Sequence, residues 1–260
     1  MSRHLFWLSD EAWAAIEPHL PRGRPGKPRV DDRTVISGIL HVLKTGCRWR
    51  DVPAAYGPPT TIYNRYNRWA GHGIWQRLFE KIAASGAVPD ELSIDSSHVK
   101  AHRSAAGSKK GEWEEAIGRS RGGRTCKIHC LADDRGRPVA FTLTPGNIAD
   151  ISVAIPLLSR ATPARRLLAD KAYDADSLRN WLRQRRIKPV IPSTASRRKP
   201  YPLDKRIYRR RNAIERLFCH LKNWRRIATR YDRHATNYLA AIALVALITA
   251  WLKMSPRPRV

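Results

Sequence analysis

The sequence is poor in acidic residues and has no apolar segment of transmembrane length. It carries 22 Asp and Glu against 49 Lys and Arg among 260 residues, which gives a formal net charge of +27. The apolar run Tyr238–Leu252 covers 15 residues, whereas a helix needs about 17–25 to cross a bilayer. Residues 1–8 lack the charged and apolar regions of an export signal. We therefore expect a cytoplasmic protein with no membrane partner.

Cysteine is also scarce, with four residues at positions 47, 126, 130 and 219. In a chain this long and basic they form no disulfide framework, which suits a reducing compartment. Cys126 and Cys130 flank His129, but no second ligand pair stands at the spacing of a zinc finger. We interpret these cysteines as small apolar residues of a strand.

Positive charge is what the sequence has in excess. Such a charge indicates a polyanionic partner, because each neutralised phosphate releases condensed counterions. Membrane surfaces are anionic too, so charge alone does not choose between them. The chain is 42% hydrophobic with nine Trp, enough to bury a substantial core.

Residues 1–88 predict a small all-α domain with a helix-turn-helix. One helix is expected at about 32–44, ending at Gly46, and Thr60 is expected to cap a second helix at 61–69. Asn and Arg side chains hydrogen-bond to base edges in the major groove of DNA. A plain helical bundle with a solvated face is the alternative. The residues expected to contact DNA are Thr61, Tyr63, Asn64, Arg65, Asn67 and Arg68.

Residues 89–254 change to the periodicity of strands. The expected order is strand, strand, strand, helix, strand, helix, strand, helix, which predicts a mixed five-stranded sheet with helices on both faces. Among α/β folds, the ribonuclease H-like fold fits this order best, although a fold alone settles no function. Residues 103–124 are rich in Gly, Ser, Lys and Arg and predict an exposed, partly flexible insertion.

Two aspartates are expected to meet at one edge of this sheet. Asp95 lies within the first strand and Asp170 ends the fourth. Adjacent carboxylates repel each other and raise each other's pKa, a cost that a metal ion removes. Oxygen ligands favour Mg²⁺ or Mn²⁺.

Helix geometry adds a third carboxylate. At about 100° per residue, four side chains fall within roughly 60° of one another around a helix: Tyr208, Arg211, Glu215 and Lys222. Apolar residues beside them can rest on the sheet while Glu215 reaches the aspartates, and Arg211 and Lys222 can meet phosphates. An ordinary amphipathic helix with a charged flank fits this spacing equally well.

The spacing Tyr208-x2-Arg211-x3-Glu215-x6-Lys222 resembles the signature of bacterial insertion-sequence transposases of the DDE class, in the group named after insertion sequence five. Segments 46–53, 61–69, 95–102, 118–123 and 170–174 resemble the same group, in order, so the likeness covers about residues 5–252. Pro58-Pro59 departs from the pattern, where an aromatic residue is expected.

The resemblance implies two metal ions per active site, with Asp95 and Asp170 as shared ligands. Glu215 would complete one site and assist proton removal. Tyr208, Arg211 and Lys222 would bind DNA. The implied partner is double-stranded DNA, as the terminal inverted repeats of the element and as target, near the bacterial nucleoid. Pairing two ends implies a homodimer or a larger assembly.

Two other functions stay open from the sequence. One is a metal-dependent nuclease that never joins DNA, and the other is a domesticated, sequence-specific DNA-binding protein. The intact set Asp95, Asp170, Glu215 and Lys222 argues against the second. Structural or surface roles are expected for His98, His102 and His129, and turn or cap positions for Asp133, Asp134, Asp150, Asp174 and Asp176.

Overall fold

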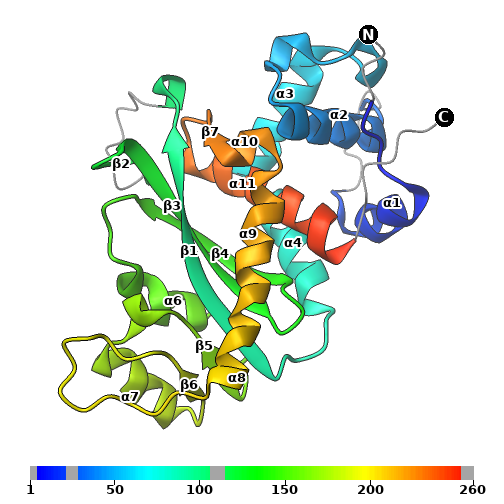
Figure 1. Cartoon of the computed structure of the whole chain (residues 1–260). Helices are drawn as coiled ribbons and strands as arrows, with labels where there is room; N and C mark the ends of the chain where they lie inside the picture. The colour runs from blue at the N-terminus through cyan, green and yellow to red at the C-terminus, as the bar shows by residue number, and fades with distance from the viewer. Residues whose placement is uncertain (1–4, 22–28, 106–114, 253–260) are drawn as a thin grey trace.

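The computed structural model describes residues 5–21, 29–105 and 115–252. Within these ranges four α-helices precede the first strand, and six follow strand β4 (Figure 1). The helices are α1 (Asp10–Ile16), α2 (Asp32–Thr45), α3 (Pro59–Gly71), α4 (Ile74–Ala84), α6 (Ala154–Leu158), α7 (Asp176–Gln184), α8 (Lys205–Tyr208), α9 (Asn212–Lys222), α10 (Arg225–Ala228) and α11 (Ala235–Ala246). In the part of the chain described, no helix is both long enough and apolar enough to cross a membrane.

The first helices begin and end largely where their cap residues predict. Ser9 Oγ accepts a hydrogen bond from Ala12 N at 3.2 Å, and α2 ends at Gly46 in the left-handed conformation with φ +74°. The expectation that Thr60 caps the next helix is wrong, because α3 begins at Pro59. Proline suits the first helical position, where no backbone N–H is needed.

The sheet contains seven strands. They are β1 (Glu91–Ala101), β2 (Gly118–Ser120), β3 (Gly123–Asp133), β4 (Pro138–Pro145), β5 (Arg166–Leu168), β6 (Lys188–Val190) and β7 (Thr229–Arg230). The five main strands run in the order β4-β3-β1-β5-β6, with β1, β3 and β4 antiparallel and β5 and β6 parallel to β1. The predicted mixed five-stranded sheet is confirmed, with two short strands added at β3 and β1.

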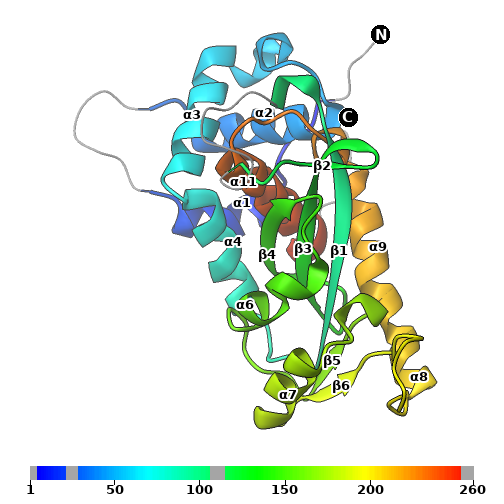
Figure 2. The same ribbon diagram turned by 90° about the vertical axis from the view of Figure 1, so that its left-hand side faces the viewer.

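The two faces of the sheet bury two separate apolar clusters. Along β3, Ile128 and Cys130 join the larger cluster, and Leu131 joins the smaller one. On β1, Val99 belongs to the larger cluster and Ile94 to the smaller. Since side chains alternate along a strand, odd-numbered residues of β1 face the larger cluster. Helix α9 runs along β1 on that side (Figures 1 and 2).

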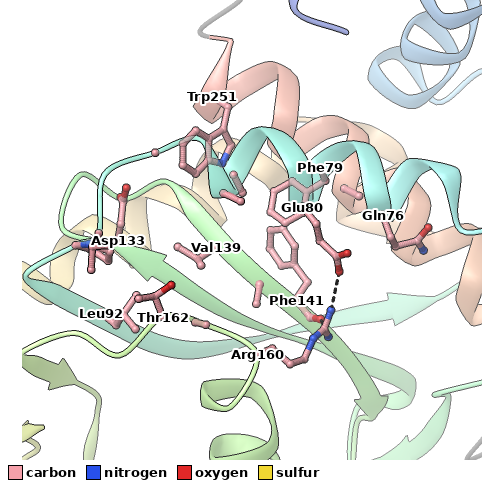
Figure 3. Close-up of a pocket in the computed structure, with 18 of the residues that line it drawn as sticks. Gln76, Phe79, Glu80, Leu92, Asp133, Val139, Phe141, Arg160, Thr162 and Trp251 are labelled. Carbon is pink, nitrogen blue, oxygen red and sulfur yellow. Dashed lines mark hydrogen bonds and ion pairs between the residues drawn. The ribbon is translucent and has the colours of Figure 1, made fainter. Parts of the chain in front are cut away.

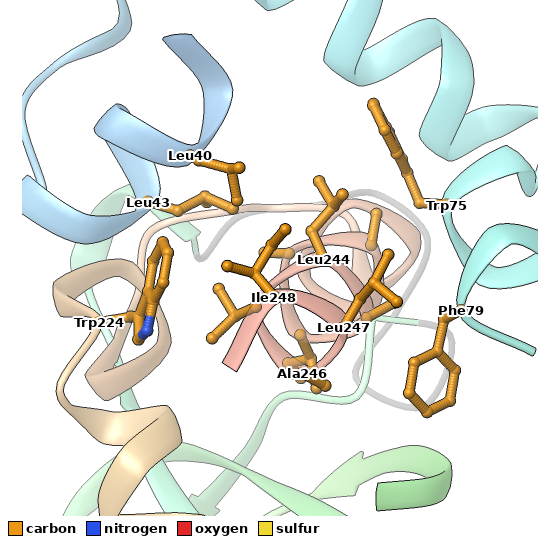
Figure 4. Close-up of a cluster of buried hydrophobic side chains, with 14 of the residues drawn as sticks. Leu40, Leu43, Trp75, Phe79, Trp224, Leu244, Ala246, Leu247 and Ile248 are labelled. Atoms are coloured by element: carbon orange, nitrogen blue, oxygen red, sulfur yellow. The ribbon is translucent and has the colours of Figure 1, made fainter. Parts of the chain in front are cut away.

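The N-terminal helices and the sheet share the larger cluster. Helix α11 contacts α2, α3 and α4 as well as β4. Figure 4 shows Leu244 of α11, and Ile248 of the π-helical turn Leu247–Trp251 that follows it, between Leu43 on one side and Trp75 on the other. The last helix therefore fills the interior that the first helices enclose.

Two expected elements differ from the structure. The single helix expected to carry Tyr208, Arg211, Glu215 and Lys222 is divided into α8, a 3₁₀ turn Arg209–Arg211, and α9, with α10 following. The expected insertion at 103–124 is partly built into the fold, because residues 115–118 are buried and Gly118 begins β2. Residues 106–114 of that insertion lie outside the described residues.

Candidate active site

Asp95 and Asp170 lie at the same level of two adjacent parallel strands. The pairing of β1 with β5 places Ser93 opposite Leu168. Asp95 comes two residues after Ser93, and Asp170 two residues after Leu168, so the same register brings the carboxylates level. The strand order thus joins residues that are 75 apart in the sequence (170 − 95).

Asp95 is a half-buried carboxylate among like charges. Its side chain is 15% exposed, and its Oδ1 accepts a hydrogen bond from Ser96 N at 2.8 Å. Burial raises the pKa of Asp95 above its ordinary value, and the charges of Asp170 and Glu215 raise it further, against the opposing effect of Arg211. A carboxylate in this state gains stability when a cation binds.

Asp170 is fixed by the turn that follows β5. It caps the 3₁₀ turn Lys171–Tyr173, and its Oδ1 accepts a hydrogen bond from Ala172 N at 2.9 Å. The cap holds one oxygen of the carboxylate toward the backbone. The other oxygen is available to a ligand, since a carboxylate accepts several bonds.

Arg211 joins Asp95 to Glu215. Its Nη2 donates to Asp95 Oδ2 at 3.0 Å, and its Nη1 forms a short ion pair with Glu215 Oε1, one helical turn along α9. The Arg211 side chain is 12% exposed and that of Glu215 is 52% exposed. Burial acts to lower the pKa of Arg211, but the anionic groups around it, Asp95 first, raise it overall, so the guanidinium stays charged.

The other two residues of the helical signature also lie near this site. Lys222 Nζ donates to the carbonyl oxygen of His98 on β1 at 3.1 Å. Tyr208 is half-buried, and burial raises its pKa, as do the charges of Asp170 and Glu215. The expected helical face therefore meets the expected edge of the sheet.

A second arginine anchors the start of this face, and the sequence did not reveal it. Arg210 Nη1 donates to Glu91 Oε1 at 3.0 Å, and Arg166 donates to the same oxygen at 2.8 Å. The Glu91 side chain is 4% exposed. Glu91 and Asp95 lie four residues apart on β1. The consecutive residues Arg210 and Arg211 therefore bind this strand at two points.

The donor set fits a hard divalent cation. Asp95, Asp170 and Glu215 offer only carboxylate oxygens, which Mg²⁺ and Mn²⁺ prefer. Within residues 5–21, 29–105 and 115–252, however, no three His, Cys, Asp or Glu side chains are grouped so that they could hold a metal ion. In this structure the guanidinium of Arg211 is paired with both Asp95 and Glu215.

The expected DNA-reading helix is present, but one of its residues faces inward. Arg65 is 8% exposed and forms a short ion pair with Asp32. The prediction that Arg65 is presented to DNA is therefore wrong. The burial of the other expected contacts divides them: Tyr63, Asn64 and Arg68 are exposed, and Thr61 and Asn67 are half-buried.

Two spare carboxylates have structural partners rather than cap positions. Asp150 accepts hydrogen bonds from Ser96 Oγ at 2.8 Å and Lys127 Nζ at 2.9 Å, and it caps no helix. Asp174 does not cap α7 either, because it pairs with Arg179 and Arg197. Both expectations of a cap were wrong.

The other acidic and histidine residues also lie outside the carboxylate group. Asp133 accepts bonds within its hairpin turn, as expected. His129 is fully buried and bonded to Thr144 Oγ1, and burial lowers its pKa to about 4. His102 is exposed and stacks on Tyr231.

A cavity of about 520 Å³ opens on another part of the surface. It lies between α4, β4 and Trp251, with Phe79 and Phe141 on its wall and the ion pair of Glu80 with Arg160 at one side (Figure 3). None of the three carboxylates lines it. The candidate site lies elsewhere, where β1, the end of β5 and the start of α9 meet.

Comparison with known families shows which class of protein this chain belongs to. Residues 86–250, more than half of the chain, match the model of the transposase DDE domain. The chain belongs to the DDE transposases. Residues 8–79 match a second model, "Putative transposase of IS4/5 family". This DDE transposase is thus of the bacterial insertion-sequence type, an enzyme that cuts DNA and transfers its strands, and the resemblance seen in the sequence is confirmed.

Similar proteins agree with this assignment. The transposase is 34% identical over 130 residues to "Putative transposase for insertion sequence element IS6501" of Brucella ovis, a match that covers 50% of this chain and 99% of that protein. It is 32% identical over 136 residues to "Putative transposase for insertion sequence element IS402" of Burkholderia cepacia, covering 48% of this chain and 62% of that protein.

Solved structures confirm the fold. The piggyBac transposase in a synaptic complex with hairpin DNA aligns with 95% of this chain and 72% of its own, with a TM-score of 0.53 and 11% identity. At that identity the likeness concerns the fold alone, which is ribonuclease H-like with an N-terminal helical region.

Proposed function

We propose that this transposase binds the ends of its insertion sequence, cleaves them and joins them to target DNA at the site formed by Asp95, Asp170 and Glu215. The observation that carries the proposal is the shared level of Asp95 and Asp170 on adjacent parallel strands, with Glu215 linked to Asp95 through Arg211. Three carboxylates that lie close together repel one another, and bound metal ions remove that cost.

In this proposal Asp95, Asp170 and Glu215 hold two Mg²⁺ or Mn²⁺ ions. The bound ions supply Lewis-acid activation of the attacking oxygen and stabilisation of the leaving oxygen in an in-line displacement. Asp95 and Asp170 orient the ions, since their carboxylates are fixed by the strand and the turn. Glu215, the most exposed of the three, also accepts the proton of the attacking water or 3′-hydroxyl.

Basic residues beside the carboxylates bind the DNA backbone. Arg211 and Lys222 lie on the same helical face as Glu215 and donate to phosphates. Tyr208 contacts the strand near the point of cleavage. The N-terminal helices recognise the terminal repeats through the exposed Tyr63, Asn64 and Arg68. Both ends of the element are held by a homodimer or larger assembly.

A strand-transfer assay with end-containing DNA tests the proposal. Asp95→Asn, Asp170→Asn and Glu215→Gln are each expected to abolish cleavage and joining and to retain DNA binding. Asp134→Asn, an exposed carboxylate in the hairpin turn, serves as the matched control and keeps full activity. Hydrolysis without joining would identify a nuclease, and binding without either reaction would identify a DNA-binding regulator.

A further inference from the structure

Arg211 holds two of the three proposed metal ligands at once. We infer that Arg211 is a resident cation that exchanges partners: it neutralises Asp95 and Glu215 in the DNA-free protein, and it moves to a DNA phosphate when divalent ions take the carboxylates. The inference rests on the proposed function of the site and adds that metal binding and DNA binding are coupled through one side chain.

Arg211 is held mainly by its two carboxylate partners, Asp95 and Glu215. Its two Nη atoms pair with Asp95 and Glu215. Its Nε is buried and has no hydrogen-bond partner among the described residues. A guanidinium has five N–H donors in a planar fork, and a phosphate can take two of them together. The present arrangement therefore leaves hydrogen bonds that a phosphate would satisfy.

Electrostatic repulsion disfavours a state in which the Arg211 guanidinium and a divalent ion bind the same carboxylates. A guanidinium and a divalent ion on the same two carboxylates repel each other at contact range. Arg211 must therefore lower the affinity of the DNA-free protein for metal. The site becomes fully available only when another anion attracts Arg211.

The structure lets Arg211 leave without moving the helix. Arg210, its neighbour, remains bound to the buried Glu91, which Arg166 also holds. The backbone of the 3₁₀ turn Arg209–Arg211 is thereby tied to β1 independently of Asp95. Arg210 can therefore hold the turn in place when the side chain of Arg211 leaves the carboxylates. The pair also supplies a matched control for experiments.

Coupling of this kind is reciprocal by thermodynamic necessity. A phosphate that removes Arg211 from the carboxylates raises metal affinity, and a metal that displaces Arg211 frees it for phosphate. The protein would then hold metal weakly until DNA is in place, which restricts the hydrolytic site to the assembled complex.

Mn²⁺ binding to the DNA-free, full-length protein provides the first measurement. Arg211→Gln is expected to bind Mn²⁺ about tenfold or more tightly than wild type. Arg211→Lys should fall between them, because one ammonium cannot bridge both carboxylates. Arg210→Gln should bind Mn²⁺ as wild type does. If Arg211→Gln does not fold, Arg211→Lys against Arg210→Gln gives the same comparison.

DNA binding provides the second measurement. The affinity of wild type for a short labelled duplex, followed by fluorescence anisotropy, should be higher in Mn²⁺ than in EDTA. This gain should persist in Arg210→Gln and largely disappear in Arg211→Gln.

The outcomes separate the inference from the proposed function. If Asp95→Asn loses Mn²⁺ binding but Arg211→Gln binds no more tightly than wild type, Arg211 is not the resident cation and the metal site stands. If Mn²⁺ binding is the same in wild type, Asp95→Asn and Asp170→Asn, the carboxylates hold no metal, and both ideas are overturned.

Discussion

Arg65 and Asp32 form an ion pair inside the N-terminal helical region, with 9% and 10% of their side chains exposed. The guanidinium of Arg65 also stacks over the ring of Trp69, 5.2 Å from its centroid. The pair links the middle of α3 to the first residue of α2. Arg65 therefore links the two helices, with its guanidinium turned away from solvent.

Arg65→Ala is expected to destabilise the protein. Removing Arg65 leaves Asp32 paired with Arg29 alone, so we expect a loss of about 1.5–3 kcal/mol in the free energy of unfolding, the worth of a charged hydrogen bond. Urea unfolding measures the loss. Arg68→Ala, three residues further on the exposed side of α3, should change the free energy of unfolding by less than about 0.5 kcal/mol. A stable Arg65→Ala protein that had lost its preference for element ends would restore Arg65 as a reading residue.

Asn64→Ala and Arg68→Ala should reduce discrimination between element ends and random duplex. Each lost base contact is worth roughly 1–3 kcal/mol. Competition binding at fixed salt measures the ratio of the two affinities. Arg77→Ala, which removes an exposed arginine from α4, controls for the general loss of charge. Unchanged discrimination in both α3 variants would exclude α3 as the reading helix.

Asp95→Asn should melt no lower than wild type in EDTA at neutral pH. Burial raises the pKa of Asp95, so the folded protein holds its proton more tightly than the unfolded chain does. The ionised Asp95 therefore costs stability once the pH rises above its ordinary pKa of 3.8, and asparagine removes that cost. Thermal melts give the comparison, and Mg²⁺ should raise the melting temperature of wild type alone. A variant that melts well below wild type would show that Asp95 holds the fold through its hydrogen bonds.

Asp174→Asn should destabilise the protein most at neutral pH. Burial opposes ionisation, but hydrogen bonds from Arg197, Thr194 and Arg179 lower the pKa of Asp174 from 3.8 to about 2. A lowered pKa contributes stability above 3.8 that is lost as the pH falls toward 2. We expect a loss of about 1.5–3 kcal/mol at pH 7, since charged hydrogen bonds are removed. The difference from wild type should shrink below pH 3.8.

Asp176→Asn is the control for that series. Asp176 pairs with the same Arg197, but its side chain is 66% exposed. Its loss should cost at most about 1 kcal/mol. Equal effects of the two variants across the whole pH range would contradict the assignment of the low pKa to Asp174.

The alternation of strands and helices was within reach of the sequence. The periodicity of residues 89–254 predicted a mixed five-stranded sheet, and the structure contains it. The meeting of Asp95 and Asp170 followed from one acidic residue within the first predicted strand and another at the end of the fourth, and the parallel pairing of β1 with β5 brings them together. Strands β2 and β7 have three and two residues, too few for a periodic pattern.

Buried ion pairs were beyond the sequence. Arg65 lies about 60° around α3 from the buried Ile62, at the border between faces. Whether a long side chain at that border turns inward depends on Asp32, 33 residues away, which no local pattern reveals. Arg211 presents the same difficulty: its spacing placed it beside Glu215, but only the packing of α9 on β1 brings it to Asp95.

The packing of the first helices depends on helix α11, which comes near the end of the sequence. The first helices leave the ribosome long before residues 235–246, which fill their interior. A shortened product ending before α11 would lack the core that positions α2, α3 and α4. For the same reason, exchange of the N-terminal helices between relatives is expected to require a matching last helix.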